Sequence, residues 1–379
     1  MKIITDADVK GKRVIVRVDY NVPRKDGKIV DDTRIVGSLK TINYLIENKA
    51  KVILLSHLGR VESEEDKDKN SLKVVADHLS TLVKVPVYFS HDTKGSVLET
   101  TVDNLLEGEI LLVENTRYED YPKKLESSCD EGLSKYWASL GDIFVLDAFG
   151  SAHRCHASTY GISKYIPSYA GFLVQDEVKM LDKAMKEKRN LLLGGAKVDD
   201  KIGVINNLIP NSTKVLIGGA MCFTFLKVKG FNTGESIISE ENIDYVKKLL
   251  DKYSDKIILP VDFVTQNGVK KIEEFNSKDI GYDIGPETIK LFKNELKNSN
   301  LVLWNGPLGK YEENEYENGT KEIMKYLEGE KFPTILAGGD VTGAASYFKV
   351  KMYYVSTGGG STLEYLEGKK FKTLERLNG

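Results

Sequence analysis

The chain has 379 residues, of which 41% are hydrophobic and 29% are charged, a balance typical of a folded globular protein and not of a disordered or fibrous one. This length exceeds the size at which a single hydrophobic core keeps growing, so we expect two domains. Its 54 Lys and Arg residues against 56 Asp and Glu give a net charge of −2, which excludes a general electrostatic attraction for nucleic acid or anionic lipid.

The N-terminal sequence MKIITDADVKGKRVIV has no long apolar stretch before a small-residue cleavage pattern, and no run of 18 apolar residues occurs in the chain. The cysteines, Cys129, Cys155 and Cys222, are odd in number and contain no CxxC pair, which argues against a disulfide framework. We therefore expect a cytoplasmic protein that binds neither membrane nor nucleic acid.

Short apolar runs recur along the first half, and each is followed by a stretch with the helical spacing of apolar positions. The runs are VIVRVD (14–19), KVILLSH (51–57), EILLVEN (109–115) and IFVLDAFG (143–150). Runs that are apolar on both faces are typical of buried parallel strands covered by helices. The first half is thus predicted to be an α/β domain, with its polar residues at the carboxyl edge of the sheet, where ligands bind in such folds.

The basic residues of this half indicate an anion site. All five His and seven of the nine Arg residues lie within the first 156 positions. Because the planar fork of Arg matches phosphate and carboxylate oxygens, Arg residues that follow successive strands can converge on one small anion. The candidates are Arg34, Arg60, Arg117 and Arg154. A lone His57 or Arg60 would more often be a surface residue or a helix cap, but recurrence at strand ends favours a site.

In the segment RVDYNVP, Arg17, Asp19 and Asn21 alternate at strand spacing, so their side chains share one face. Asp19 and Asn21 could bind a hydroxyl group, or they could merely shape a turn.

The segment DAFGSAHRCHAST (147–159) raises the alternative of a zinc site at His153, Cys155 and His156. We reject it, because such close neighbours cannot easily complete a tetrahedron and no second pair lies at zinc-site spacing. Cys155 beside Arg154 could have a lowered thiol pKa, or it could be a small apolar filler; its reactivity stays open.

The stretch from 172 to 189 has the apolar spacing of a long amphipathic helix and is the candidate connector between the domains. The second half then repeats the alternation of strands and helices. Its runs are LLLGGA (191–196), KVLIGGA (214–220), IILPVD (257–262), LVLWNGP (301–307), TILAGGD (334–340) and YYVSTGGG (353–360).

Glycine clusters follow several of these runs, and each could bring backbone N–H groups close to a phosphate. Neither GxxxxGK[ST] nor GxGxxG with a ribose-binding acid is present, so a nucleotide must be held in another way. Asp340 supplies a hard oxygen ligand suited to nucleotide-bound Mg²⁺. Lys197 and Lys201, four residues apart, share one face at the start of a helix and could bind phosphate or be a solvated surface.

Nine segments, taken in order, resemble the signature series of phosphoglycerate kinases. They span nearly the whole chain and are RVDYNVP, SHLGR, ENTRYED, DAFGSAHRCHAST, LLGGAKVDDKI, LIGGAM, LWNGPLGKYE, AGGD and STGGGSTLE. The resemblance implies an α/β protein of two doubly wound, Rossmann-like domains, each with a mainly parallel sheet, joined by a long connector helix. It assigns residues 1–171 to a phosphoglycerate-binding domain, to which the tail 356–379 returns, and residues 172–355 to a nucleotide-binding domain.

The same resemblance implies reversible phosphoryl transfer between 1,3-bisphosphoglycerate and Mg-ADP, giving 3-phosphoglycerate and ATP, by a monomer that closes its domains over the reactants. The phosphoglycerate ligands it implies are Asp19, Asn21, Arg34, His57, Arg60, Arg117 and Arg154. The nucleotide contacts are Gly195, Lys197, Lys201, Gly219, Asn305, Glu312, Gly338, Gly339, Asp340 and Val341, with Glu312 on the ribose and Asp340 on the metal. The groups expected to act on the migrating phosphoryl are Arg34, Lys197, Gly338 and Gly359.

The chain departs from the family pattern after GGD, where Thr or Ser is usual and Val341 stands here, followed by Thr342. This substitution is the one hint of an alternative, a non-catalytic nucleotide-binding sensor on the same scaffold. A nicotinamide-dependent dehydrogenase is a second alternative, disfavoured because GxGxxG is missing.

Overall fold

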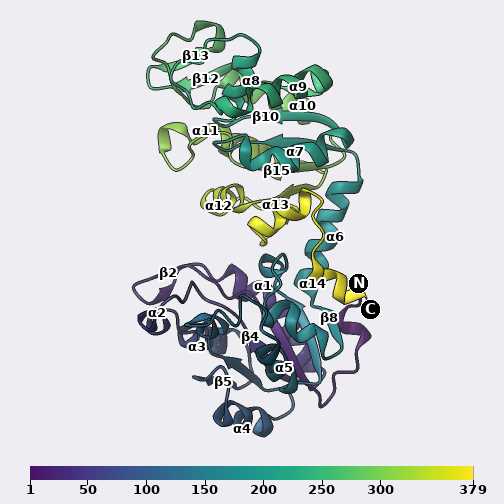
Figure 1. The fold of residues 1–379 in the computed structure, drawn as a ribbon. Helices are drawn as coiled ribbons and strands as arrows, with labels where there is room; N and C mark the ends of the chain where they lie inside the picture. Colours follow the sequence, from purple (N-terminus) through teal and green to yellow (C-terminus); the bar gives the residue numbers. More distant parts are fainter. Residues whose placement is uncertain (379) are drawn as a thin grey trace. The chain divides into compact units, whose positions relative to one another are not determined.

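The structure, a computed structural model, describes residues 1–378 and divides into two compact units (Figure 1). Met1–Val178 and the described residues from Lys370 onward form the first unit, and Lys179–Lys369 form the second. Each unit contains a six-stranded parallel sheet with helices on both faces, which confirms the predicted α/β class. The units change at 178/179 and 369/370, whereas the sequence placed these boundaries at 171/172 and 355/356.

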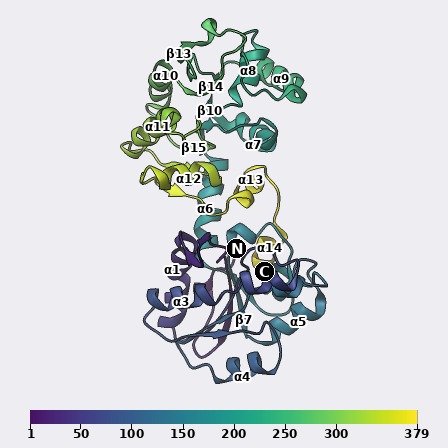
Figure 2. The ribbon, with the colours of Figure 1, turned by 90° about the vertical axis from the view of Figure 1, so that its left-hand side faces the viewer.

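The first sheet has the strand order β5-β6-β4-β1-β7-β8. Figure 2 shows α1 and α3 on one side of this sheet and α5 on the other. Its strands are β1 (Arg13–Val18), β4 (Lys51–Leu55), β5 (Val87–Ser90), β6 (Ile110–Val113), β7 (Ile143–Asp147) and β8 (Ser168–Ala170). The other elements of this unit are the hairpin β2 (Arg24–Lys25) and β3 (Lys28–Ile29), and the helices α1 (Thr33–Glu47), α2 (Glu64–Lys69), α3 (Lys73–Leu82), α4 (Ser96–Asn104), α5 (Glu131–Ser139) and α14 (Lys372–Glu375).

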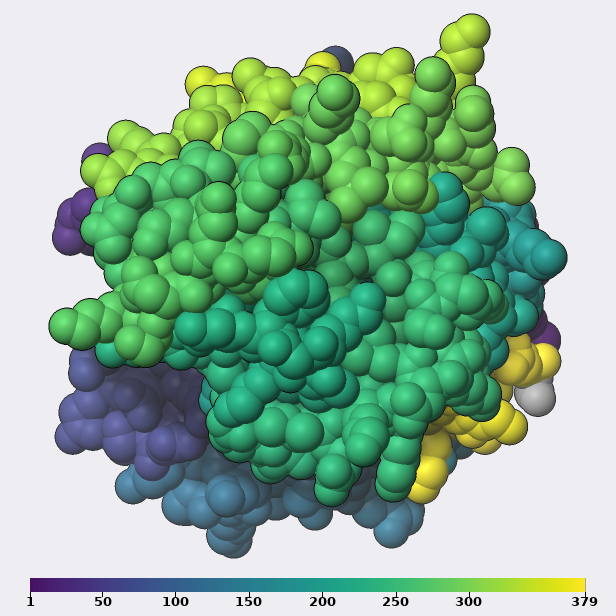
Figure 3. All heavy atoms as spheres, turned by 90° about the horizontal axis from the view of Figure 1, so that it is seen from above, coloured from purple at the N-terminus to yellow at the C-terminus, as the bar shows by residue number. Residues whose placement is uncertain are grey.

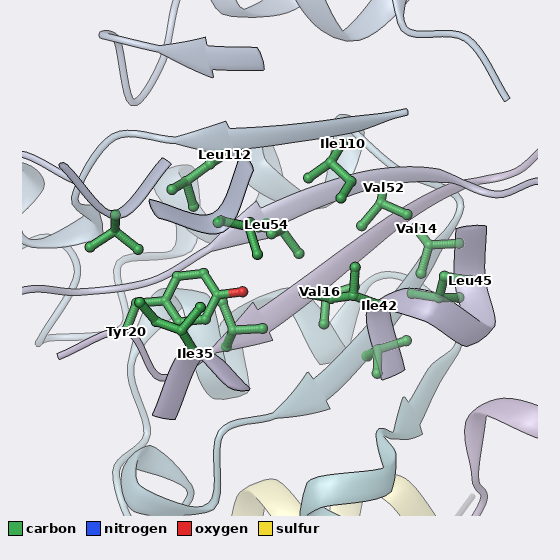
Figure 4. Packing of buried hydrophobic residues seen from close by; sticks show 14 of the residues in the cluster. Val14, Val16, Tyr20, Ile35, Ile42, Leu45, Val52, Leu54, Ile110 and Leu112 are labelled. Carbon is green, nitrogen blue, oxygen red and sulfur yellow. The ribbon is translucent and has the colours of Figure 1, made fainter. Parts of the chain in front are cut away.

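Alternate residues of the central strands point to opposite faces of this sheet, and both faces are buried. Val14 and Val16 of β1 pack with Val52 of β4 against Ile42 and Leu45 of α1, as Figure 4 shows. The intervening strand residues are equally buried against the opposite layer. Burial on both faces explains why these strands read in the sequence as continuous apolar runs.

The second sheet has the order β11-β10-β9-β15-β16-β17, so the chain winds outward from β9 in one direction and from β15 in the other. In such doubly wound sheets, ligands bind beyond the carboxyl ends of the strands at the point of reversal, here between β9 and β15. Its strands are β9 (Arg189–Leu193), β10 (Ser212–Ile217), β11 (Ile257–Ile258), β15 (Val302–Asn305), β16 (Thr334–Leu336) and β17 (Tyr354–Val355). Its helices are α7 (Ile202–Leu208), α8 (Cys222–Val228), α9 (Ile243–Tyr253), α10 (Pro286–Leu296), α11 (Asn318–Glu328), α12 (Gly339–Tyr347) and α13 (Gly360–Leu366).

The predicted connector is helix α6 (Phe172–Lys186), which carries the chain from the first unit into the second. Its first turn is anchored in the first unit, because the Asp147 side chain accepts a hydrogen bond from Leu173 N at 2.9 Å and Thr41 Oγ1 accepts one from Phe172 N at 2.9 Å. The helix ends three residues before the sequence predicted, since Arg189 already belongs to β9.

A small antiparallel sheet in the second unit was not predicted. It consists of β12 (Asp262–Thr265), β13 (Gly268–Lys271) and β14 (Gly281–Ile284), in the order β13-β12-β14. With α8, α9 and α10, coloured teal to green, it belongs to the face of this unit that Figure 3 shows.

The C-terminal tail enters the first unit later than predicted. Helix α13 still packs on α7 of the second unit, where Asn207 Nδ2 donates to Leu366 O at 2.7 Å. Residues 370–378 lie in the first unit, and Lys2 N donates to Leu377 O at 2.6 Å. Within residues 1–378, no helix is long and apolar enough to cross a membrane.

Candidate functional site

The carboxyl edge of the first sheet gathers the predicted anion ligands around Asp19, one residue beyond β1. Asp19 Oδ2 accepts a hydrogen bond from Arg34 Nη1 of α1 at 2.8 Å. Although burial favours the neutral acid, the charges of Arg34 and Arg17 lower the pKa of Asp19 below its usual value. Asp19 is therefore a carboxylate that holds Arg34 in place.

Asn21 fixes the neighbouring loops. Its backbone N–H donates to Asp19 Oδ1 at 3.2 Å, and its Oδ1 accepts from Gly59 N at 2.9 Å. These contacts give Asn21 the turn-shaping role that was one of the two readings from sequence. It also lines a cavity of about 380 Å³ with Arg24, Gly59 and Lys69.

Arg17 is part of this cluster, although the sequence pattern did not single it out as an anion ligand. Its side chain is buried, and its Nη2 lies 3.1 Å from Nδ1 of His57, which follows β4. Burial and then the charge of Arg17 lower the pKa of His57 to about 3, with smaller effects from Arg117 and Arg34. A charged residue inside an apolar run must find partners when it is buried, and this was the signal that could have identified Arg17.

Arg117 and His156 extend the cluster from two further loops. Arg117 Nη1 pairs with Asp120 Oδ2 at 3.3 Å, and its backbone N–H donates to Asn115 Oδ1 at 3.0 Å. Burial and then Arg117, Arg17 and Arg154 lower the pKa of His156 to about 3. His156 is thus a second neutral imidazole among the arginines.

Two predicted ligands lie at the surface. Arg154 is exposed and its Nε donates to His153 Nε2 at 2.8 Å, so it lies at the edge of the cluster. Arg60 is exposed, and its backbone carbonyl accepts a hydrogen bond from Asn70 Nδ2 at 2.8 Å. The structure therefore brings together Arg34, His57 and Arg117. Arg60 is not among the charged groups that shift the pKa of His57.

In the second unit, the glycine clusters after β9, β10 and β15 serve to pack three loops against each other. Gly195 N donates to Pro307 O at 2.8 Å, and Gly219 N donates to Leu308 O at 3.0 Å. A Cβ on Gly219 would lie 2.5 Å from Gly195 N, and both glycines have positive φ angles. Because these N–H groups already have partners, the two glycines shape the site and do not supply its phosphate donors.

The glycines that begin α12 and α13 have a different environment. A Cβ added at Gly339, Gly359 or Gly360 would meet no atom within 4 Å, so these backbones border open space. The first N–H groups of a helix have no partner within the helix, and those of α12 are therefore oriented for an anion. Gly338 has a φ of +102°, and a Cβ added there would lie 2.5 Å from Asn305 Nδ2, so this position favours glycine.

Asn305 and Asp340 lie near this helix start. Asn305 is buried at the end of β15; its Nδ2 donates to Ala337 O, and its Oδ1 has no hydrogen-bond partner. Asp340 is exposed in the first turn of α12. Burial lowers the pKa of Lys201, and the carboxylates of Asp340 and Asp200 oppose that change, which indicates that Lys201 and Asp340 are near neighbours.

The remaining predicted nucleotide residues differ in exposure. Lys197 and Glu312 are both exposed. Val341 is fully buried in the hydrophobic cluster of this unit, so its side chain packs against the core. Thr342 Oγ1 donates to Gly339 O at 2.9 Å.

Comparison with known proteins gives matches over essentially the whole chain. The family model described as "Phosphoglycerate kinase" matches residues 4–369. The phosphoglycerate kinase of Enterococcus faecalis is 47% identical over 392 residues, which covers 100% of this chain and 99% of that protein. That of Fusobacterium nucleatum is 48% identical, with 100% and 99% covered.

Solved structures agree. The phosphoglycerate kinase of Coxiella burnetii superposes with a TM-score of 0.88 at 35% identity, covering 99% of this chain and 98% of that one. The enzyme of Pyrococcus horikoshii gives a TM-score of 0.85 at 29% identity, covering 100% and 98%. With a full-length family match and relatives close to 50% identity, the chain belongs to the phosphoglycerate kinase family.

Proposed function

We propose that the chain catalyses reversible phosphoryl transfer between 1,3-bisphosphoglycerate and Mg-ADP, giving 3-phosphoglycerate and ATP. The observation that carries this proposal is the cluster of Arg17, Arg34, His57 and Arg117 at the carboxyl edge of the first sheet. Three guanidinium groups and a neutral imidazole at one edge of the sheet supply many hydrogen-bond donors, which suits a small polyanion.

The first unit is the proposed phosphoglycerate-binding domain. Arg34 and Arg117 would bind the charged oxygens of the substrate, and Asp19 would keep Arg34 oriented. Neutral His57 would donate a hydrogen bond. The full proposed set is Asp19, Asn21, Arg34, His57, Arg60, Arg117 and Arg154, in which Arg60 and Arg154 are exposed side chains that would contact the anion from the surface.

The second unit is the proposed nucleotide-binding domain. The packed glycine loops at the point of strand reversal would form its floor, and the start of α12 would face the phosphates. Glu312 would bind the ribose, and Lys197 and Lys201 the phosphates. The full proposed set is Gly195, Lys197, Lys201, Gly219, Asn305, Glu312, Gly338, Gly339, Asp340 and Val341, the last through its backbone.

Magnesium is proposed to be bound through Asp340. Within residues 1–378, no group of three or more His, Cys, Asp or Glu could hold a metal ion alone. A single exposed carboxylate at a helix start suits Mg²⁺ that arrives on nucleotide phosphates, because this ion uses one or two carboxylates beside phosphate and water oxygens. When bound, the ion would neutralise phosphate charge during transfer.

The chemistry needs no general base. The acceptor is a carboxylate, which is already ionised at neutral pH. His57, with a pKa of about 3, is a weak base, which suits a reaction that removes no proton. Arg34, Lys197 and the helix starts at Gly338 and Gly359 would stabilise the charge that spreads over the migrating phosphoryl group. One chain supplies both sets of ligands, so we expect an active monomer.

The test is formation of ADP from ATP that depends on 3-phosphoglycerate and Mg²⁺, measured in a coupled assay. We expect turnover with both reactants and none when either is omitted. Tight binding of ATP without turnover would instead favour the non-catalytic sensor.

A further inference from the structure

Glu126 is a buried carboxylate in the first unit that the proposed reaction does not use directly. It lies in the loop before α5 and is fully buried. Both of its oxygens accept hydrogen bonds from one residue, since Oε2 accepts from Ser158 N at 2.9 Å and Oε1 accepts from Ser158 Oγ. Because both oxygens act as acceptors, the hydroxyl proton of Ser158 must point toward Glu126.

The oxygen of that hydroxyl is therefore free to accept, and it does so from Arg17. Arg17 Nε donates to Ser158 Oγ at 2.9 Å, and Arg17 Nη1 donates to Val18 O. These two contacts fix the plane of the guanidinium group. The remaining nitrogen, Nη2, is then directed at His57 Nδ1, 3.1 Å away.

The contact between Arg17 and His57 has only one chemically possible direction. A guanidinium group has donors and no acceptor, so His57 Nδ1 must accept. An imidazole that accepts at Nδ1 and is neutral carries its proton on Nε2. The neutral state is maintained by burial and by the surrounding cations Arg17, Arg117 and Arg34.

Glu126 is the carboxylate that most compensates the buried charge of Arg17. Arg17 is 1% exposed, and burial lowers its pKa, while Glu126 and Asp19 oppose that effect, with the larger contribution from Glu126. Asp19 is already engaged with Arg34. Without Glu126, Ser158 would no longer be held as an acceptor, and Arg17 would keep its charge in an apolar setting with weaker compensation.

We propose that Glu126 is a positioning residue for substrate binding: through Ser158 it orients Arg17, and Arg17 holds His57 in the tautomer whose Nε2–H donates to the substrate. This inference rests on the proposed function, in which His57 binds phosphoglycerate. It concerns which ring nitrogen carries the proton, a property that can be measured without turnover.

The first measurement is long-range ¹⁵N–¹H NMR correlation of the His57 ring in the full-length protein, assigned with a His57→Gln variant. We expect the native spectrum at neutral pH to show a protonated Nε2 and an unprotonated Nδ1. In Glu126→Gln and Ser158→Ala we expect mixed tautomers at His57. We also expect a rise of roughly tenfold in the KM for 3-phosphoglycerate, the effect of losing one hydrogen bond to a charged ligand, with the KM for ATP unchanged.

Glu119→Gln is the matched control, because Glu119 is also a buried carboxylate of the first unit but is bound to Thr93 and Lys94. It should leave the His57 spectrum and the KM for 3-phosphoglycerate as in the native protein. Ser158→Ala keeps the acid in place, so it gives the answer even where Glu126→Gln does not fold.

The inference is overturned by a native Nδ1–H tautomer, by Ser158→Ala with unchanged spectrum and KM, or by Glu119→Gln with the same changes as Ser158→Ala. Absence of turnover in the native chain would instead refute the proposed function and leave the tautomer result standing on its own.

Discussion

Replacing Gly194 with Ala tests whether the glycine loops of the second unit act by close packing. The backbone of Gly194 has no positive φ, so Ala is sterically allowed there by its own dihedral angles. Its Cβ, however, would lie 2.0 Å from Pro307 O and 2.6 Å from Gly306 O, distances that real Cβ atoms essentially never show. The loops after β9 and β15 must therefore separate by roughly 1 Å.

Three backbone hydrogen bonds join these loops to each other and to the loop after β10. They run from Gly194 N to Asn305 O at 2.9 Å, from Gly195 N to Pro307 O at 2.8 Å and from Gly219 N to Leu308 O at 3.0 Å. At a net value of roughly 1 kcal/mol each, their loss gives a decrease of about 2–4 kcal/mol in the free energy of unfolding. For a unit of this size that corresponds to a drop in Tm of roughly 5–15 °C.

The assay is thermal unfolding followed by circular dichroism, together with ADP binding by calorimetry, for which we expect at least a tenfold loss of affinity. Gly329→Ala is the control, since its Cβ would lie 3.5 Å from the nearest atom, Tyr326 O, an ordinary contact. A Gly194→Ala protein with the Tm of the control and native ADP affinity would refute the packing argument.

Three other changes have defined outcomes. Arg34→Ala should lower kcat by about a thousandfold in the coupled assay with little change in the KM for ATP, because the side chain would act on the migrating phosphoryl group; Arg24→Ala, which loses only loop contacts to Lys69 and Asn70, is its control. Lys197→Ala should lower kcat and also raise the KM for ATP roughly tenfold in the same assay, because the lysine would bind the phosphates and stabilise the migrating group. Burial raises the pKa of Asp147 to about 7. Its contribution to the free energy of unfolding is therefore present below about pH 4 and is lost as the pH rises toward 7. Asp147→Asn should remove this pH dependence from the free energy of unfolding, measured with urea across that range.

Each of these would be contradicted by a simple result. Near-native kcat in Arg34→Ala would remove Arg34 from the proposed catalytic groups, and an unchanged KM for ATP in Lys197→Ala would make that lysine a solvated surface residue. A native pH slope retained in Asp147→Asn would assign the slope to another group.

The sequence predicted the central strands of both sheets because these strands are buried on both faces. The runs at 51–57 and 143–150, for example, correspond to β4 and β7. The edge strands β11 and β17 lie within the predicted runs 257–262 and 353–360. The edge strand β5 and the antiparallel strand β13 were not predicted: β5 is partly exposed along most of its length, and β13 is largely exposed. Their pairing depends on neighbours that are distant in sequence, and no local pattern carries that information.

For the candidate site, the residue types at strand ends pointed to Arg34, His57 and Arg117, which the structure brings together. Sequence could not separate a glycine that packs loops, such as Gly194, from one that borders open space, such as Gly339, because both follow an apolar run. That distinction depends on which strands are neighbours in the folded sheet.

The tail of the chain bears on the order in which the protein can be completed during synthesis. Thr373 donates to Ala152 O, and Arg376 Nη2 donates to Ser163 O at 2.7 Å, so the residues after 369 close over loops of the first unit. The ribosome makes those residues only after the whole of 179–369. The half of the protein that begins first is thus finished last, and a stalled or truncated chain would present a complete second unit beside a first unit that still lacks its closing segment.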